Sequence, residues 1–131
     1  MAAKKKILLI DDEQNFCFFV KNNLENTGEF NVIYATDPSE GIRIARTEPP
    51  DLILLDILMP KMEGSQVAEV LLTDPRTKQI PLLFLTAVVT EAEIGLKAIK
   101  KIGGQNFIAK PVDTKRLISC IKAVTEEKAR V

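Results

Sequence analysis

The stretch Leu52-Ile53-Leu54-Leu55-Asp56 places four consecutive apolar residues directly before an aspartate. A strand with one face in water alternates apolar and polar residues, whereas an unbroken apolar run predicts a strand that is covered on both faces. Strands covered in that way belong mostly to parallel sheets with helices packed on each side. The stretch therefore predicts a buried parallel strand that ends in a carboxylate.

The same organisation extends over the rest of the chain. Four other short segments are rich in apolar or β-branched residues, namely 7–10, 30–35, 80–85 and 105–109. Longer amphipathic segments separate them and predict helices over 13–27, from 37 to before 49, and over 65–73, 91–101 and 113–128. A strand followed by a helix, five times over, predicts an α/β fold with a doubly wound five-stranded parallel sheet and helices on both faces.

Local signals delimit these helices. Asp37 before Pro38 is a typical N-cap with a proline in the first turn, and Gly28 is a typical C-cap. The buried stripe of the first helix is expected to contain Phe16, Val20 and Leu24. The buried stripe of the last helix is expected to contain Leu117, Ile121 and Val124. At about 100° per residue, Phe18 lies nearly opposite the first of these stripes, and we expect it to be exposed.

Composition restricts the function classes. The 131 residues suit one domain spanning 1–131, and 18 basic residues balance 18 acidic ones. Nucleic-acid-binding domains of this size are usually basic, so direct DNA or RNA binding is not expected. The chain has no histidine, which excludes histidine metal ligands and imidazole acid–base catalysis. Two distant cysteines, Cys17 and Cys120, favour free thiols over a disulfide framework or a zinc site.

No apolar segment has the length of an export signal or a membrane span. The run that follows the basic N-terminus, Ile7-Leu8-Leu9-Ile10, has four residues, whereas a signal peptide needs at least about 7 and a membrane span about 20. We therefore expect a cytoplasmic chain without a membrane partner.

Polar side chains follow four of the five predicted strands. These strand-end residues are Asp11, Asp12, Asp56, Thr86 and Lys110. The carboxyl ends of parallel strands meet at one edge of a sheet, so we expect these side chains to lie close together. Clustered carboxylates repel one another, and a divalent cation with oxygen ligands, such as Mg²⁺, relieves that repulsion. Carboxylates combined with a hydroxyl and an ammonium group suit a phosphoryl group, with one carboxylate as the nucleophile.

Four stretches around these strand ends form one ordered set. They are Ile10-Asp11-Asp12-Glu13, Leu54-Leu55-Asp56-Ile57-Leu58-Met59-Pro60-Lys61-Met62-Glu63-Gly64, Leu85-Thr86-Ala87 and Phe107-Ile108-Ala109-Lys110-Pro111. Together they resemble the receiver domain of two-component response regulators, over nearly the whole chain. The resemblance implies a flavodoxin-like (βα)5 fold and a phosphoryl-accepting signalling module rather than an enzyme.

The resemblance implies a role for each matched residue at the predicted edge. Asp56 is similar to the phosphoacceptor, which takes a phosphoryl group from a phosphohistidine. The Mg²⁺ ligands would be Asp11, Asp12 and Asp56 with the backbone carbonyl of Leu58. Lys110 resembles the cation that pairs with the acceptor and then with its phosphoryl oxygens.

The resemblance also implies a switch and partners. Thr86 resembles the switch hydroxyl, and Phe107 resembles the aromatic residue that turns inward in the active state. The donor would be a sensor histidine kinase or a histidine phosphotransfer protein. A downstream protein or a second copy would bind the fourth helix, fifth strand and fifth helix, here 91–101, 105–109 and from 113 onward. We expect Phe18 to join the donor's docking patch, with a dimer contact or no role as open alternatives.

Three other functions are weighed against this interpretation. A small phosphatase that forms an aspartyl phosphate needs a carboxylate two residues after the nucleophile; Leu58 stands there after Asp56, and Glu13 stands there after Asp11. A flavodoxin-like cofactor binder needs a loop rich in Gly, Ser or Thr after the first strand, and that segment is acidic here. A receiver that works without phosphorylation is expected to lack Asp56 or Lys110. The phosphatase is therefore the second candidate.

Overall fold

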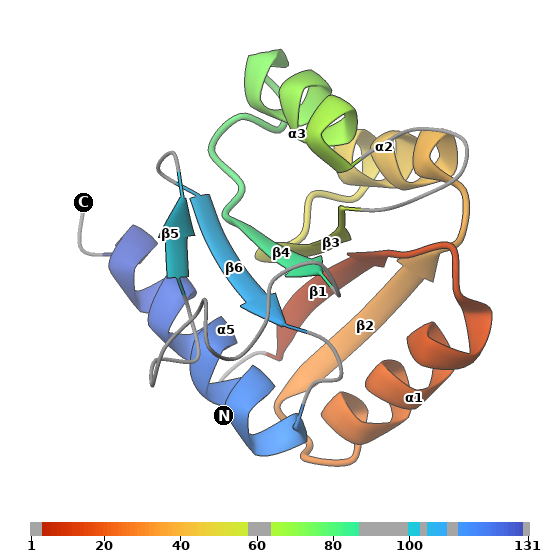
Figure 1. Cartoon of the computed structure of the whole chain (residues 1–131), viewed down its shortest axis with the longest axis vertical. Coiled ribbons are helices and arrows are strands. Elements are labelled where there is room, and N and C mark those ends of the chain that lie inside the picture. Colours follow the sequence, from red (N-terminus) through yellow and green to blue (C-terminus); the bar gives the residue numbers. More distant parts are fainter. Residues whose placement is uncertain (1–3, 58–63, 87–99, 103–104, 110–112, 130–131) are drawn as a thin grey trace.

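The computed structural model of the chain describes residues 4–57, 64–86, 100–102, 105–109 and 113–129. Within these ranges one sheet contains β1 (Lys5–Ile10), β2 (Phe30–Ala35), β3 (Leu52–Asp56), β4 (Leu82–Thr86), β5 (Lys100–Ile102) and β6 (Gln105–Ala109). The helices are α1 (Gln14–Glu25), α2 (Pro38–Thr47), α3 (Gly64–Thr73) and α5 (Thr114–Ala129). Figure 1 shows α1 and α5 on one face of the sheet and α2 and α3 on the other. In the described part of the chain no helix is both long and apolar enough to cross a membrane.

The predicted doubly wound parallel sheet is confirmed, with one addition. The strand order is β2-β1-β3-β4-β6-β5, and the five predicted strands run parallel. The additional strand β5 pairs antiparallel with β6 and contains Lys100 and Lys101, which the sequence predicts as the end of a helix. Only Gly103 and Gly104 separate β5 from β6, and a Gly-Gly pair favours a tight hairpin as well as a helix stop. Residues 91–99 of that predicted helix lie outside the described residues.

The two faces of the sheet bury two separate apolar cores. In β1, Ile7 and Leu9 pack with residues of α1 and α5, whereas Leu8 and Ile10 pack with residues of α2 and α3. None of these four side chains is more than 1% exposed. Successive side chains of a strand point to opposite faces, so a run of four apolar residues supplies both cores at once.

The buried stripe of α1 differs from the predicted one by a single position. Cys17, Val20 and Leu24 are buried, while Phe16 is partly buried against the same core. On a helix with 100° per residue, positions 17, 20 and 24 lie within about 60° of one another, and position 16 lies at their margin. The predicted stripe of α5 is confirmed by the burial of Leu117, Ile121 and Val124. Cys17 and Cys120 are both buried, and neither forms a disulfide.

Helix α2 packs on β1 through a glycine. Asp37 caps the helix as predicted, because its carboxylate accepts the backbone N–H of Glu40 at 3.2 Å. Gly41 is buried one turn into the helix, and a Cβ atom there would lie 2.6 Å from Cδ1 and 2.7 Å from Cγ1 of Ile10. Ile10 is 0% exposed and has little room to move aside. The absence of a side chain at position 41 therefore sets how closely α2 approaches the sheet.

Gly41→Ala is expected to destabilise the protein, although alanine is normally favoured over glycine in a helix interior by about 1 kcal/mol. The added Cβ overpacks the contact with Ile10, and overpacking usually costs about 1–3 kcal/mol of the free energy of unfolding. Urea unfolding measures the change, with Ser39→Ala on the exposed side of α2 as the control. An unchanged or higher unfolding midpoint for Gly41→Ala would contradict the packing argument.

Two side chains of α1 cover part of the open edge of β2. The Val32 N–H donates to Oε2 of Glu25 at 3.0 Å, and the Val32 carbonyl accepts from Nζ of Lys21 at 2.6 Å. Lys21 and Glu25 also pair with each other at 3.0 Å. The Val32 N–H and the Lys21 ammonium lower the pKa of Glu25 below its usual value, because both stabilise the carboxylate. Because the backbone N–H and carbonyl of Val32 are both hydrogen-bonded to α1, the edge of β2 cannot pair with another strand at this residue.

Glu25→Gln is expected to reduce the stability that this cover provides. The pKa of Glu25 is lowered in the folded state, so its contribution is present above the ordinary value of 4.5 and is lost as the pH falls through the lowered pKa. For a partly exposed pair we expect a loss of about 0.5–1 kcal/mol at about pH 7, and a smaller loss at about pH 3. Urea unfolding at both pH values tests this, with the exposed Glu69→Gln of α3 as the control. A pH-independent difference from the wild type would argue against the ion pair.

Candidate functional site

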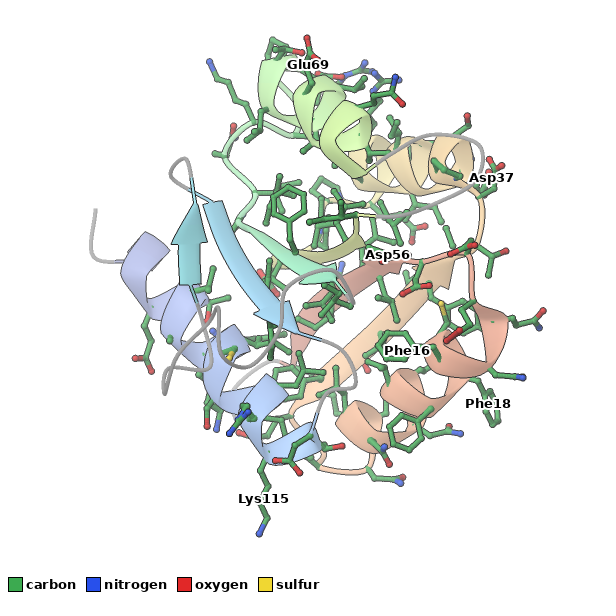
Figure 2. All side chains as sticks on the ribbon, viewed as in Figure 1. Phe16, Phe18, Asp37, Asp56, Glu69 and Lys115 are labelled. Atoms are coloured by element: carbon green, nitrogen blue, oxygen red, sulfur yellow. The ribbon has the colours of Figure 1, made fainter. Side chains whose placement is uncertain are left out.

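Three aspartates from two strand ends converge at the carboxyl edge of the sheet. β1 and β3 are parallel neighbours with Ile10 in register with Leu55, so the next residues, Asp11 and Asp56, reach the same edge. One carboxylate oxygen from each of Asp11, Asp12 and Asp56 lies within 4.8 Å of the others. Figure 2 shows Asp56 at this edge, beside the end of β1. The sheet topology thus assembles an acidic group from positions far apart in the sequence.

Asp11 is oriented by backbone and side-chain contacts. Its N–H donates to the Ala35 carbonyl at 3.1 Å, and its Oδ1 accepts the N–H of Glu13 at 2.9 Å. Its carbonyl accepts the thiol of Cys17 at 3.3 Å. The contacts of Glu13 and Cys17 with Asp11 are not predicted from the sequence. Aspartate side chains commonly accept the N–H two residues later in a turn, and this preference indicates the contact with Glu13. No sequence signal indicates the contact with Cys17.

Burial of the carboxylates determines the electrostatics of the site. Asp11 is 0% exposed and Asp56 is 5% exposed, while Asp12 is exposed. Buried negative charges that lie close together are unfavourable unless positive charge or protons compensate them. Several carboxylate oxygens at a partly open edge are the donor set that Mg²⁺ prefers, so the residues present fit a hard divalent cation.

The predicted switch residues lie on β4, which neighbours β3, and on β6, the next strand after β4. Asp56 is in register with Leu85 of β4, so Thr86, the last residue of β4, stands one position beyond it. Phe107 lies in β6, in register with Phe84. The strand order therefore places β4 next to β3, the strand that ends in Asp56, and β6 on the far side of β4.

Two predicted site residues, Leu58 and Lys110, lie outside the described residues. In the sequence, Lys110 follows directly on Ala109, the last residue of β6, and Leu58 comes two residues after Asp56. The structure thus brings together the three aspartates, and it does not test the lysine or the carbonyl of Leu58.

Comparison with known proteins identifies the family. The response regulator receiver domain profile matches residues 7–122. The chain belongs to the response regulator receiver family. This receiver is a module of two-component signalling, as predicted, and its fold is that of its structural neighbours. Receiver domains are in general signalling modules rather than enzymes; they bind Mg²⁺ at an acidic pocket and connect phosphodonor kinases to downstream effectors.

Curated relatives agree with the family assignment. The receiver is 35% identical over 122 residues to the alkaline phosphatase synthesis transcriptional regulatory protein PhoP of Bacillus subtilis, covering 92% of this chain and 48% of PhoP. It is 33% identical to protein PilH of Pseudomonas aeruginosa, covering 91% of this chain and 96% of PilH. It is 30% identical to a probable chemotaxis protein CheY of Rhizobium etli, covering 95% of each chain. The receiver spans about half the length of PhoP and nearly the whole length of the other two.

Solved structures show the same architecture. A CheY-like response regulator receiver domain protein from Methanospirillum hungatei superposes with a TM-score of 0.80 at 27% identity and covers 98% of both chains. A response regulator from Desulfuromonas acetoxidans superposes with a TM-score of 0.77 at 29% identity, covering 94% of this chain and 98% of its own. The fold is therefore shared over nearly the full length of these receivers.

Asp12→Asn is expected to stabilise the receiver in the absence of divalent cations, because it removes one negative charge from the acidic group. We expect the free energy of unfolding in a chelating buffer to rise by about 1 kcal/mol, and the added stability that Mg²⁺ confers on the wild type to diminish. Thermal unfolding with and without Mg²⁺ measures both effects, with Glu69→Gln as the control. A variant that is less stable in the chelator and responds fully to Mg²⁺ would show that the carboxylates do not act as one group.

Proposed function

We propose that this receiver accepts a phosphoryl group on Asp56 and thereby changes a partner-binding surface. The observation that carries the proposal is the group formed by Asp11, Asp12 and Asp56, whose carboxylate oxygens lie within 4.8 Å of one another. Asp56 ends β3, which has β1 and β4 as its two neighbours in the sheet. Residues at the ends of both neighbouring strands can therefore act on a group attached to it.

In the proposed transfer, a carboxylate oxygen of Asp56 attacks the phosphorus of a phosphohistidine. The new P–O bond forms as the P–N bond breaks, and the bonding electrons remain on the donor imidazole, which then takes up a proton. The three aspartates and the carbonyl of Leu58 would hold Mg²⁺, which when bound neutralises charge on the phosphoryl oxygens. Lys110 contributes a second positive charge from the end of β6. Asp11 keeps its orientation through its contacts with Glu13 and Cys17.

The proposed response depends on Thr86 and Phe107. A phosphoryl group on Asp56 offers new acceptor oxygens to the Thr86 hydroxyl, so phosphorylation raises the population of the conformer in which the hydroxyl meets the phosphoryl group. In this proposal Phe107, on β6 beside β4, then turns inward. The output surface combines the predicted helix from 91, β6 and α5, on which Lys115 and Lys122 are exposed. That surface suits an acidic downstream protein or a second copy.

The donor is proposed to be a sensor histidine kinase or a histidine phosphotransfer protein, because the chain has no histidine of its own. We further propose that residues 1–131 form a single receiver domain that acts in the cytoplasm. Its balanced charge, 18 basic against 18 acidic residues, supports a protein partner over direct contact with nucleic acid or a membrane surface.

Acetyl phosphate tests the acceptor without a protein donor. With Mg²⁺ present, we expect the intact mass to rise by one phosphoryl group, and we expect Asp56→Asn to abolish the rise because an amide is not a competent nucleophile. Asp51→Asn, an exposed residue directly before the other end of β3, is the matched control and should be labelled like the wild type. Labelling that persists in Asp56→Asn, or that does not require Mg²⁺, would contradict the assignment.

An aspartyl-phosphate phosphatase is the second candidate, since it uses the same nucleophile. Such an enzyme also needs an acid to protonate the leaving group, and Leu58 occupies the position two residues after Asp56. We therefore expect no sustained turnover of p-nitrophenyl phosphate. Repeated turnover that Asp56→Asn abolishes would favour the phosphatase.

A further inference from the structure

Cys17 is the buried residue of α1 that lies nearest to the acidic group in the sequence. It is 0% exposed, whereas the next two residues, Phe18 and Phe19, are 59% and 52% exposed. Figure 2 shows Phe18 pointing away from the sheet and Phe16 toward it. With about 100° per residue, this phase of the helix turns position 17 toward the interior. The thiol is therefore held against the core, close to where β1 ends.

Two groups of Cys17 reach back to the segment that contains the aspartates. Its thiol donates to the Asp11 carbonyl at 3.3 Å, and its backbone N–H donates to the Glu13 carbonyl at 3.1 Å. Glu13 is the N-cap residue of α1, but its side chain makes no capping hydrogen bond to the described residues. The contacts of Cys17 therefore help to join the start of α1 to the end of β1.

The carbonyl that accepts the thiol belongs to the peptide between Asp11 and Asp12. A peptide unit is planar and moves as one body, so a contact that fixes this carbonyl restricts the residues on both sides of it. Asp11 is also held through its N–H, which donates to Ala35 at 3.1 Å, and through its carboxylate, which accepts the Glu13 N–H at 2.9 Å. Among these three contacts, that of the thiol is the one on the Asp12 side of the residue.

Fixing this peptide affects how well the aspartates can bind a cation. Carboxylates that lie close together repel one another, so they tend to move apart when no cation is bound. A site that is held in its converged arrangement binds more tightly, because binding then requires less rearrangement. Hydrogen-bond partners of metal-ligating residues commonly change metal affinity by about 10–100-fold. A thiol is a weak donor, so its effect should be smaller.

We propose that Cys17 is a positioning residue for the acidic group, and that its thiol raises the affinity of this receiver for Mg²⁺ by fixing the peptide between Asp11 and Asp12. The inference rests on the proposed function, because it takes the three aspartates as ligands of the cation. Packing alone does not require a donor at this position, since Val20 and Leu24, the other buried residues of α1, have none. A thiol combines apolar volume with a hydrogen-bond donor.

Cys17→Ala and Cys17→Ser separate the donor from the packing, because both remove the sulfur and only the serine variant keeps a donor. Titration calorimetry with magnesium chloride should give a dissociation constant about 3–10-fold higher for Cys17→Ala than for the wild type. We expect Cys17→Ser to stay within about twofold of the wild type. Urea unfolding in a chelating buffer should show both variants to be less stable, with no advantage for serine, because its hydroxyl is more polar than the thiol it replaces.

Cys120 provides the matched control. It is 2% exposed in the same apolar core as Cys17, but it lies on α5. We expect Cys120→Ala and Cys120→Ser to lower the stability as well and to leave the affinity for Mg²⁺ unchanged. A second measurement reports on the contact itself. A hydrogen bond to a carbonyl polarises its peptide, so the amide nitrogen resonance of Asp12 in metal-free buffer should shift more in Cys17→Ala than in Cys17→Ser.

The alanine and serine variants give clear grounds for rejecting the proposal. Cys17→Ala that binds Mg²⁺ as tightly as the wild type, or Cys17→Ser that loses as much affinity as Cys17→Ala, would overturn it. The same holds if the Cys120 variants lose as much affinity as Cys17→Ala. A wild type that does not bind Mg²⁺ would contradict the proposed function together with this inference. A wild type that binds Mg²⁺ and is insensitive to both Cys17 substitutions would overturn this inference alone.

Discussion

The register between β1 and β3 is the constraint on which the functional end of this receiver depends. Because Ile10 lies opposite Leu55 in a parallel pair, the residues that follow bring their carboxylates to one edge of the sheet. A slip of either strand would draw an aspartate into an apolar core or separate the two carboxylates, and burying an uncompensated charge is costly. The same apolar packing that stabilises the sheet therefore also determines the geometry of the acidic group.

The acidic group brings like charges close together, and nearby contacts orient it. Asp11 and Asp56 are buried close to each other, which is unfavourable without compensating charge. The Glu13 N–H donates to the carboxylate of Asp11, and the Cys17 thiol donates to its backbone carbonyl, so both parts of the residue are held. A site of this kind is most favourable when cations and a phosphoryl group occupy it together. That difference in free energy between occupied and unoccupied states is what a phosphorylation switch requires.

The exposed residues on the α2 and α3 side of the molecule differ in chemistry from those on α1. Near the end of α3, Asp74 joins Arg76 to Arg46 of α2, with contacts of 3.0 Å and 2.7 Å. The hydrogen bonds from Arg76, and that from Arg46, hold the pKa of Asp74 well below its usual range. Charges are thus paired or exposed to solvent on the side of α2 and α3, whereas α1 presents two exposed phenylalanine rings, Phe18 and Phe19. Faces with such different chemistry can serve different contacts without competing for the same partner.

The sequence by itself determined the fold class, the five parallel strands and the aspartates at the ends of two of them. It did so because an apolar run shows which residues are buried, and the charged residue after it shows where the buried strand ends. It also predicted the Asp37 cap and the apolar stripe of α5. Only the tertiary structure decided the strand β5, the burial of Cys17 ahead of Phe16, and the thiol contact with Asp11. These features depend on which surfaces meet and at what rotation and register. Local periodicity carries no information about contacts between distant parts of the chain.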